Sequence, residues 1–260
     1  MKPLLKYILK HAGIEVRRAP RPTSHSAAPG LAFYETDLGN IYLPVDAPRD
    51  SIAEKMRRGL VFEPEVVETA RRFIRPNSIV LDVGSNFGQM AMLFAREVGP
   101  DGRVFAFEAQ RRVYDILCKN IEANHLTNIE PVFRAVFEET GKIFHFPEPD
   151  FKQFEAFGSY NLPLNVTEGP EVISIKIDDC ELDRPVSFMK VDVQGCDLFA
   201  MRGAVETIRK HRMPILFEFE QRFQTEYGTT FQDYVDFTAM IGYRFAETVL
   251  DINFLIVPRD

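Results

Sequence analysis

Residues 79–88 read Ile79-Val80-Leu81-Asp82-Val83-Gly84-Ser85-Asn86-Phe87-Gly88. The apolar, β-branched run over 79–83 predicts a short buried strand, and residues 84–88 predict a tight turn. The periodicity of residues 89–98 predicts a helix directly after this turn. Glycines between a strand and a helix let the backbone approach a ligand at the helix N-terminus. Asn86 stands where many such loops have a third glycine, and asparagine tolerates a positive φ better than most residues.

Strands and helices alternate on both sides of this turn. A broken helix is predicted over 51–75, ahead of the turn. Beyond it we expect strands at 103–108, 128–137, 186–193 and 214–220, helices at 111–124, 197–211 and 231–241, and a closing hairpin at 243–248 and 252–257. This alternation is typical of a parallel sheet covered by helices on both faces. We therefore predict an α/β fold with a doubly wound, mostly parallel seven-stranded sheet of Rossmann-like type.

Residues 141–180 interrupt this alternation. Strands of antiparallel type are predicted at 142–146 and 171–177, and an aromatic-rich, irregular loop lies between them. We interpret the segment as an antiparallel insert placed before strand 4 of the main sheet.

Length and composition bound the class of protein. The chain has 260 residues and 45% hydrophobic residues, enough for one sizeable domain with a full core. Its three cysteines are widely spaced, which excludes a disulfide scaffold and a zinc ribbon and suits a reducing compartment. No stretch approaches the roughly 20 apolar residues that a membrane-spanning helix needs. The expected location is therefore the cytoplasm.

The charge of the chain is divided between two parts. Residues 1–28 carry six basic residues and one acidic residue, a balance of +5, against an overall net charge of −7. The remaining residues 29–260 therefore carry −12, which makes them a poor partner for a nucleic-acid backbone. We expect residues 1–28 to form a basic helix and linker, and residues 29–260 to form the main domain. The alternative for residues 1–21 is weak docking to an anionic membrane surface.

An acidic residue follows the turn at the distance that a nucleoside site requires. Glu108 ends the second predicted strand, twenty residues after Gly88, where a carboxylate can accept both ribose hydroxyl protons. A dinucleotide site expects G-x-G-x-x-G, whereas this turn reads D-x-G-x-x-x-G. Asp82 would repel a phosphate, yet it can face the ammonium or sulfonium group of S-adenosylmethionine. The residues therefore favour a nucleoside cofactor of that kind.

Four blocks of the chain resemble the FkbM family of S-adenosylmethionine-dependent methyltransferases. They are residues 79–88, residues 99–108, Asn120 to Asn124 with Asn128-Ile129, and residues 188–195 running on to Leu198 and residues 202–204. The resemblance implies a class I methyltransferase fold, S-adenosylmethionine as cofactor, and O-methyl transfer to hydroxyls of sugars, polyketides and related metabolites. Two departures stand out. Ala109-Gln110-Arg111 replaces the Pro-Asn-Pro that usually follows the acid, and Gln194 replaces the glutamate of Val-Glu-Gly.

The candidate cofactor-binding residues come from the turn and from the ends of the predicted strands. They are Asp82, Gly84, Ser85, Asn86, Gly88, Glu108, Ala109, Ala135 and Asp192. From the insert, His145, Phe157 and Tyr160 are candidates for contact with the acceptor, and the insert as a whole is expected to cap the acceptor site. A surface or packing role is the alternative for these three. No metal site is expected, because the acidic residues show no recognisable ligand spacing.

Two charged residues occupy a strand that should be buried on both faces. Lys190 and Asp192 are two residues apart, so they lie on the same face. Buried charges are costly unless they are paired or used. Asp192 falls at the carboxyl end of its strand, where open α/β sheets bind ligands, and is our first candidate for the catalytic base. Glu218 is the second candidate, and an internal ion pair of Asp192 with Lys190 is the alternative.

The predicted function is O-methyl transfer from S-adenosylmethionine to a hydroxyl of a sugar, a glycan or a glycosylated metabolite. Two alternatives remain open from the sequence. One is a methyltransferase for a polyketide hydroxyl or an amine, and the other is a non-catalytic nucleoside-binding module of the same fold. The expected partner is a small-molecule or glycan acceptor and not a nucleic acid.

Overall fold

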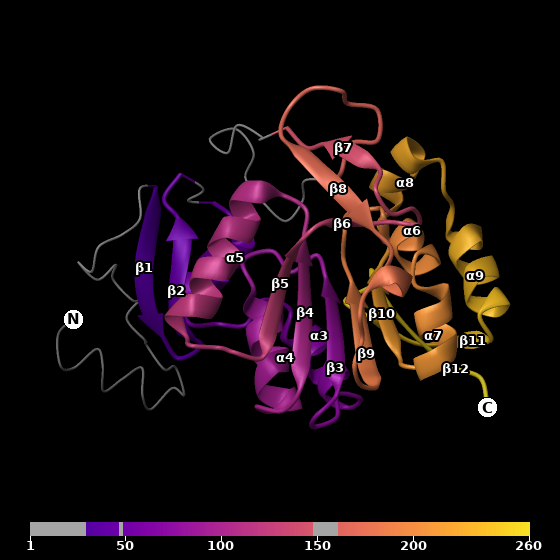
Figure 1. Cartoon of the computed structure of the whole chain (residues 1–260), viewed down its shortest axis with the longest axis horizontal. Coiled ribbons are helices and arrows are strands. Elements are labelled where there is room, and N and C mark those ends of the chain that lie inside the picture. The colour runs from indigo at the N-terminus through magenta and orange to yellow at the C-terminus, as the bar shows by residue number, and fades with distance from the viewer. Residues whose placement is uncertain (1–29, 47–48, 148–160) are drawn as a thin grey trace, which may run out of the picture.

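The computed structural model describes residues 30–46, 49–147 and 161–260. Its centre is a seven-stranded sheet of order β11-β12-β10-β9-β3-β4-β5 (Figure 1). The strands are β3 (Ile79–Val83), β4 (Arg103–Glu108), β5 (Ile129–Phe133), β9 (Val186–Val191), β10 (Ile215–Glu218), β11 (Tyr243–Val249) and β12 (Asn253–Pro258). Within this sheet, β12 alone runs antiparallel to the other six strands. The predicted doubly wound, mostly parallel seven-stranded sheet is therefore confirmed.

Helices cover both faces of the sheet because its strands are apolar on both faces. In β3, Val80 packs into a core with α3 (Pro64–Arg71), α4 (Gln89–Val98) and α5 (Arg111–Ala123), to which α2 (Ser51–Arg57) also belongs. Ile79, Leu81 and Val83 pack into the opposite core with α6 (Asp197–Arg202), α7 (Val205–His211) and α9 (Phe231–Met240). The alternation of side chains along β3 thus divides the interior into two layers.

A hairpin of β1 (Leu31–Thr36) and β2 (Gly39–Pro44), which we did not predict, packs against α5. Asn120 and Asn124 of α5 hold it through hydrogen bonds to backbone groups of Tyr42 and Asn40. Asn120 also donates to the Phe87 carbonyl oxygen at 2.8 Å. One buried amide therefore ties the hairpin to the turn that follows β3.

The insert forms its own three-stranded sheet of order β6-β8-β7, built from β6 (Ala135–Val136), β7 (Ile143–His145) and β8 (Glu171–Ile175). The antiparallel pairing of β7 with β8 agrees with the prediction. The strand predicted over 128–137 is instead two strands, because the chain leaves the main sheet at Arg134 and β6 joins the insert. The insert ends in a short 3₁₀ turn, η2 (Ile177–Asp179).

The helix predicted over 197–211 is also two elements, α6 and α7, which are separated at Gly203. A side chain at this glycine would lie 2.1 Å from the Phe137 carbonyl oxygen, so the break lets the chain pack against the insert. A further helix, α8 (Gln221–Tyr227), was not predicted. The basic helix and linker expected at 1–28 lie outside the described residues. Among the residues that are described, no helix is long and apolar enough to cross a bilayer.

Candidate active site

The turn between β3 and α4 is shaped by backbone contacts. Gly84 has a φ of +83°, and a Cβ atom there would lie 1.9 Å from the Asp192 carbonyl oxygen. The backbone N–H groups of Gly84 and Ser85 both donate to the Phe107 carbonyl oxygen of β4. Gly88, at a φ of +90°, is the N-cap residue of α4. The turn therefore presents bare backbone at the carboxyl ends of β3, β4 and β9.

Glu108 faces this turn from the end of β4. Its carboxylate accepts hydrogen bonds from the backbone N–H groups of Asn86 at 2.9 Å and Gln110 at 2.8 Å. Asn86 has a φ of +50°, and its side chain accepts a hydrogen bond from Phe87 N. Burial raises the pKa of Glu108 to about 7, although the backbone donors oppose this. A carboxylate has about four acceptor positions, so two remain for the hydroxyls of a ribose.

Lys190 lies between two carboxylates. Its Nζ atom is 3.0 Å from Asp192 Oδ2 and 3.8 Å from Asp82 Oδ1, and it donates to the Gly84 carbonyl oxygen at 3.4 Å. Burial lowers the pKa of Lys190, but the two carboxylates outweigh it and the net shift is upward. Asp82 is fully buried, which raises its pKa, and the charge of Lys190 partly opposes this increase. The internal ion pair considered from the sequence is present, and it involves both aspartates.

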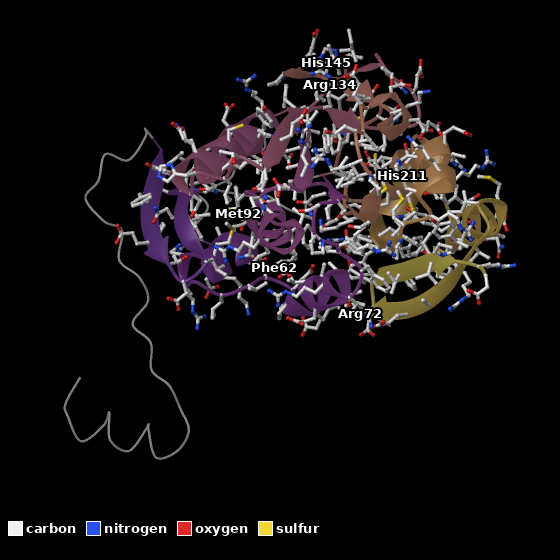
Figure 2. All side chains as sticks on the ribbon, turned by 60° about the horizontal axis from the view of Figure 1, so that its bottom comes forward. Phe62, Arg72, Met92, Arg134, His145 and His211 are labelled. Carbon is white, nitrogen blue, oxygen red and sulfur yellow. The ribbon has the colours of Figure 1, made fainter. Side chains whose placement is uncertain are left out.

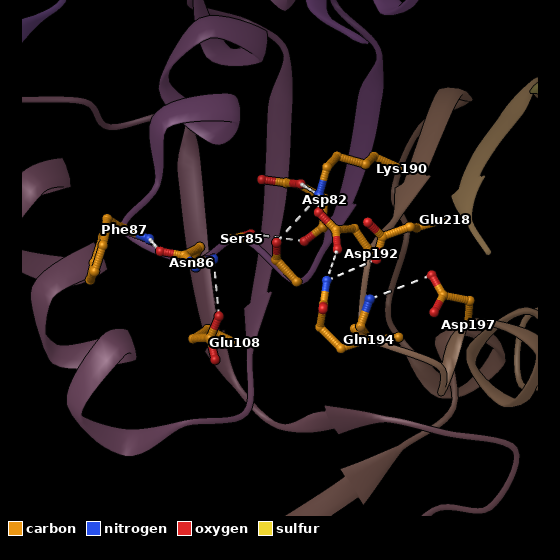
Figure 3. A network of polar contacts seen from close by, with 12 residues as sticks. Asp82, Ser85, Asn86, Phe87, Glu108, Lys190, Asp192, Gln194, Asp197 and Glu218 are labelled. Atoms are coloured by element: carbon orange, nitrogen blue, oxygen red, sulfur yellow. Dashed lines mark hydrogen bonds and ion pairs between the residues drawn. The ribbon is translucent and has the colours of Figure 1, made fainter. Parts of the chain in front are cut away.

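Gln194 joins the two candidate bases. Its Nε2 atom donates to Asp192 Oδ1 at 2.9 Å and to Glu218 Oε2 at 2.8 Å (Figure 3). Burial raises the pKa of Glu218 well above its usual range, and the charges of Asp192 and Asp197 add to this. The side chain of Asp197 accepts hydrogen bonds from the backbone of Val193 and Gly195 and thereby fixes the turn that carries Gln194. Two acidic side chains are thus held together by one amide.

A cavity of about 280 Å³ is lined by Gly84, Asn86, Glu108, Asp192, Gln194 and Glu218. This volume lies near the lower limit of sites that hold small molecules. Among the described residues that line it, six are acidic and one, Arg134, is basic; the acidic residues are Asp50, Glu63, Glu108, Asp192, Glu218 and Glu220. The insert contributes apolar lining through Val136, Phe146 and Leu162. The cavity therefore combines an acidic wall from the sheet with an apolar wall from the insert.

The candidate residues divide into those that line the cavity and those that support it. Gly84, Asn86, Glu108, Ala109, Ala135, Asp192 and Glu218 are lining residues. Asp82, Ser85 and Gly88 are not, which differs from the expected direct contact with the cofactor. Asp82 instead lies beside Lys190, and the Ser85 hydroxyl donates to the Asp82 carbonyl oxygen. These residues shape the turn, and their contact with a cofactor stays a prediction.

The acceptor contacts predicted in the insert are not supported for His145. It lies at the outer edge of the molecule (Figure 2), with Nδ1 3.2 Å from the Gly169 carbonyl oxygen, and it is not a lining residue. Its neighbours Phe144 and Phe146 point inward and are buried, so the alternation along the strand directs His145 away from the cavity. Phe157 and Tyr160 lie outside the described residues.

Several lining residues were missed as site residues from the sequence, among them Gln194 and Glu63. Gln194 was noted only as a departure from a family motif, although its position directly after the Asp192 strand was a usable signal. Glu63 comes from the segment before α3 and has a left-handed φ of +50°. Its position in the sequence gave no sign that it would reach the cavity.

The fold and the site together define a class. A parallel sheet closed by one antiparallel strand, with a glycine turn after β3 and an acid at the end of β4, is the arrangement of class I S-adenosylmethionine-dependent methyltransferases. The residues fit that cofactor, because Glu108 has acceptor positions for ribose hydroxyls and the acidic wall suits a cationic ligand. The model for the Methyltransferase FkbM domain matches residues 82–245, and the chain therefore belongs to the FkbM methyltransferase family. The domain is thus that of an enzyme whose cofactor is S-adenosylmethionine.

More distant similarities accompany the family match. The catalytic subunit TRM61 of tRNA (adenine(58)-N(1))-methyltransferase from Cryptococcus neoformans is 31% identical over 84 residues, which is 32% of this chain. The match spans 19% of the length of that curated relative. Methyltransferase FkbM from Methylobacillus flagellatus has a TM-score of 0.46 at 16% identity and covers 81% of this chain and 56% of its own. TYW2 from M. jannaschii has a TM-score of 0.49 at 14% identity, with coverage of 92% and 91%. Likenesses this distant carry no weight for the acceptor.

Proposed function

We propose that the protein transfers a methyl group from S-adenosylmethionine to a hydroxyl of a sugar, a glycan or a glycosylated metabolite. The observation that carries this proposal is the pairing of Asp192 and Glu218 by Gln194 at one wall of the cavity. The pair lies beside the Gly84 turn, because the Asp192 carbonyl oxygen and Gly84 are in backbone contact. A proton acceptor and a cofactor turn are therefore held in one rigid unit.

The chemistry required of the protein is modest. When bound, S-adenosylmethionine supplies a methyl group on a positively charged sulfur that departs as a neutral thioether. The cavity has to orient the acceptor oxygen, exclude water and accept the hydroxyl proton as the new C–O bond forms. Correct alignment contributes up to about 7–11 kcal/mol, and a general base contributes roughly 10²- to 10⁴-fold in rate.

The two carboxylates suit different parts of this task. Lys190 and Gln194 occupy both oxygens of Asp192, which suits a group that orients the acceptor hydroxyl. Glu218 has one oxygen on Gln194, and its raised pKa makes its ionised form the stronger proton acceptor. Asp192 remains the first candidate for contact with the hydroxyl, and Glu218 is the candidate for the final position of the proton.

The lining of the cavity supports a polyhydroxylated acceptor. Six acidic residues against one basic residue would repel a phosphodiester backbone, and they offer acceptors to hydroxyl groups. The apolar wall from Phe146 and Leu162 suits the C–H face of a sugar ring.

Radiolabelled methyl transfer from S-adenosylmethionine tests the proposal. The panel contains monosaccharides, oligosaccharides, an amino sugar, a polyketide alcohol and a tRNA transcript. Asp192→Asn and Glu218→Gln are compared with the exposed controls Asp101→Asn and Glu226→Gln. We expect transfer to a sugar hydroxyl that falls by about 10²-fold or more in the site variants, with unchanged affinity for S-adenosylhomocysteine.

Each other outcome has a defined meaning. Transfer only to the amine or the polyketide alcohol establishes the alternative acceptor class and contradicts the sugar proposal. Transfer to tRNA contradicts the argument from the acidic lining. Binding of S-adenosylhomocysteine without transfer to any acceptor supports a non-catalytic nucleoside-binding module.

A further inference from the structure

Glu63 lies outside residues 82–245, so the family match assigns it no role. It immediately precedes α3, and its φ of +50° is left-handed although it is not a glycine. This conformation is costly for an L-residue and persists only where the surroundings enforce it. Pro64 follows as the first residue of α3 and fixes the chain direction there. The backbone conformation therefore fixes the position of this carboxylate.

The segment that carries Glu63 is clamped to the start of α4. Gln89, which is buried, accepts a hydrogen bond from Phe62 N at 2.7 Å and donates to the Leu60 carbonyl oxygen at 3.0 Å. Gln89 is the first residue of α4, directly after the glycine turn. One amide side chain thus holds residues 60–62 against the element that positions the turn.

Glu63 and Glu108 both line the cavity, but their carboxylates differ in the hydrogen-bond donors around them. Glu63 lines the cavity, and burial raises its pKa to about 7, with a further increase from Asp192 that Lys190 opposes. Among the described residues, no side chain or backbone group donates a hydrogen bond to its carboxylate. Asp192, in contrast, receives hydrogen bonds from Lys190 and Gln194. Glu63 is therefore a lining acid whose carboxylate receives no hydrogen bond from the described residues.

The cofactor is elongated and carries an amino-acid group, with an ammonium and a carboxylate, at one end. Its ribose is assigned to Glu108, where backbone donors already orient the carboxylate. Its amino-acid end must then extend away from Glu108, toward the lining near Gly84 and Asp192, and the charge of Asp192 acts on Glu63. That end carries an ammonium group, which is the natural partner of a carboxylate that has no donor. We propose that Glu63 binds the ammonium group of the bound cofactor.

This inference rests on the cofactor assignment but not on the acceptor. Calorimetric titration of the full chain with S-adenosylhomocysteine and with 5′-methylthioadenosine separates the two ends of the ligand. Both compounds carry the adenosine and the thioether, and only the first carries the amino-acid ammonium group. Glu63→Gln is compared with Glu65→Gln, an exposed glutamate two residues further along.

We expect Glu63→Gln to weaken S-adenosylhomocysteine binding about tenfold or more, as loss of one hydrogen bond between charged groups implies. Binding of 5′-methylthioadenosine should change by less than about twofold, and Glu65→Gln should change neither. Because the ratio of the two dissociation constants is compared, any unfolded fraction of the variant cancels.

Two results overturn the inference while leaving the cofactor in place. They are equal weakening of both ligands and no weakening of either. If the wild-type protein binds neither ligand, the cofactor assignment and the proposed function fail together with the inference.

Discussion

A methyl group added at Gly84 should substantially lower the free energy of unfolding of this protein. The glycine has a φ of +83°, and its missing Cβ would lie 1.9 Å from the Asp192 carbonyl oxygen, which is a backbone atom. In Gly84→Ala the turn and the end of β9 must separate by more than an ångström. That movement stretches the hydrogen bonds from Gly84 N to Phe107 O and from Asp192 N to Val83 O.

The magnitude follows from three contributions. Left-handed strain costs about 1–2 kcal/mol, and each weakened backbone hydrogen bond costs about 0.5–1.5 kcal/mol. The total is about 2–5 kcal/mol of a stability that is typically 5–15 kcal/mol. Gly228→Ala is the matched control, because Gly228 has a φ of 64° and a ψ of 28° with nothing within 4 Å of its missing Cβ. This control should lose only the strain, about 1–2 kcal/mol.

Urea unfolding of both variants, followed by circular dichroism, measures these costs. Titration with S-adenosylhomocysteine measures the cofactor site, which should be weakened in Gly84→Ala and unchanged in Gly228→Ala. Equal losses of unfolding free energy in the two variants would refute the reasoning, since they would show that the contact with Asp192 costs nothing.

Three further predictions concern the charges of the site. Lys190→Met leaves Asp82 buried without a counter-ion and should lower the free energy of unfolding by about 3–5 kcal/mol. Adding Asp82→Leu to this variant should restore at least half of the loss. An unaltered midpoint of unfolding in urea would contradict the prediction. Gln194→Glu loses both amide hydrogen bonds, which should lower the free energy of unfolding by about 1 kcal/mol near pH 5. It also adds a carboxylate whose folded-state pKa is raised, so the loss should grow to about 3 kcal/mol near pH 8, where that carboxylate is ionised. The exposed Gln221→Glu should stay within about 0.5 kcal/mol of wild type at both pH values, and a pH-independent deficit in Gln194→Glu would argue against charge as its cause. Because the pKa of Glu218 is raised and only its ionised form accepts a proton, kcat should still increase with pH above the range in which an ordinary carboxyl group ionises. Glu218→Gln should flatten that increase, and an equally steep profile in the variant excludes Glu218.

The sequence was sufficient for the elements whose signal is local. The strand over 79–83, the glycine turn and the acid at 108 each follow from periodicity and spacing, and the structure places them as expected. The hairpin of β1 and β2 was also readable in principle, because Leu31–Thr36 and Gly39–Pro44 are apolar runs separated by two residues. We predicted no structure for that region, although its local pattern was sufficient.

Other features depend on contacts between distant segments. The break between α6 and α7 exists because Gly203 packs against the Phe137 carbonyl oxygen, and nothing within 197–211 announces that partner. The place of Glu63 in the site depends on the clamp by Gln89, which is formed across 27 residues. Its placement therefore requires the tertiary structure, and no local pattern predicts it.

The backbone contact between Gly84 and Asp192 has a different evolutionary consequence from the apolar wall of the cavity. The spacing between the cofactor turn and the acid of β9 is set by main-chain atoms, so side-chain replacement elsewhere in the cavity leaves it intact. The apolar wall, in contrast, comes from an insert that has its own small sheet and packs against Phe223 and Tyr227 of α8. On the proposed function, exchange of that insert would alter the acceptor wall and leave the spacing between the turn and Asp192 unchanged. Grafted inserts are then the natural route to altered acceptor specificity.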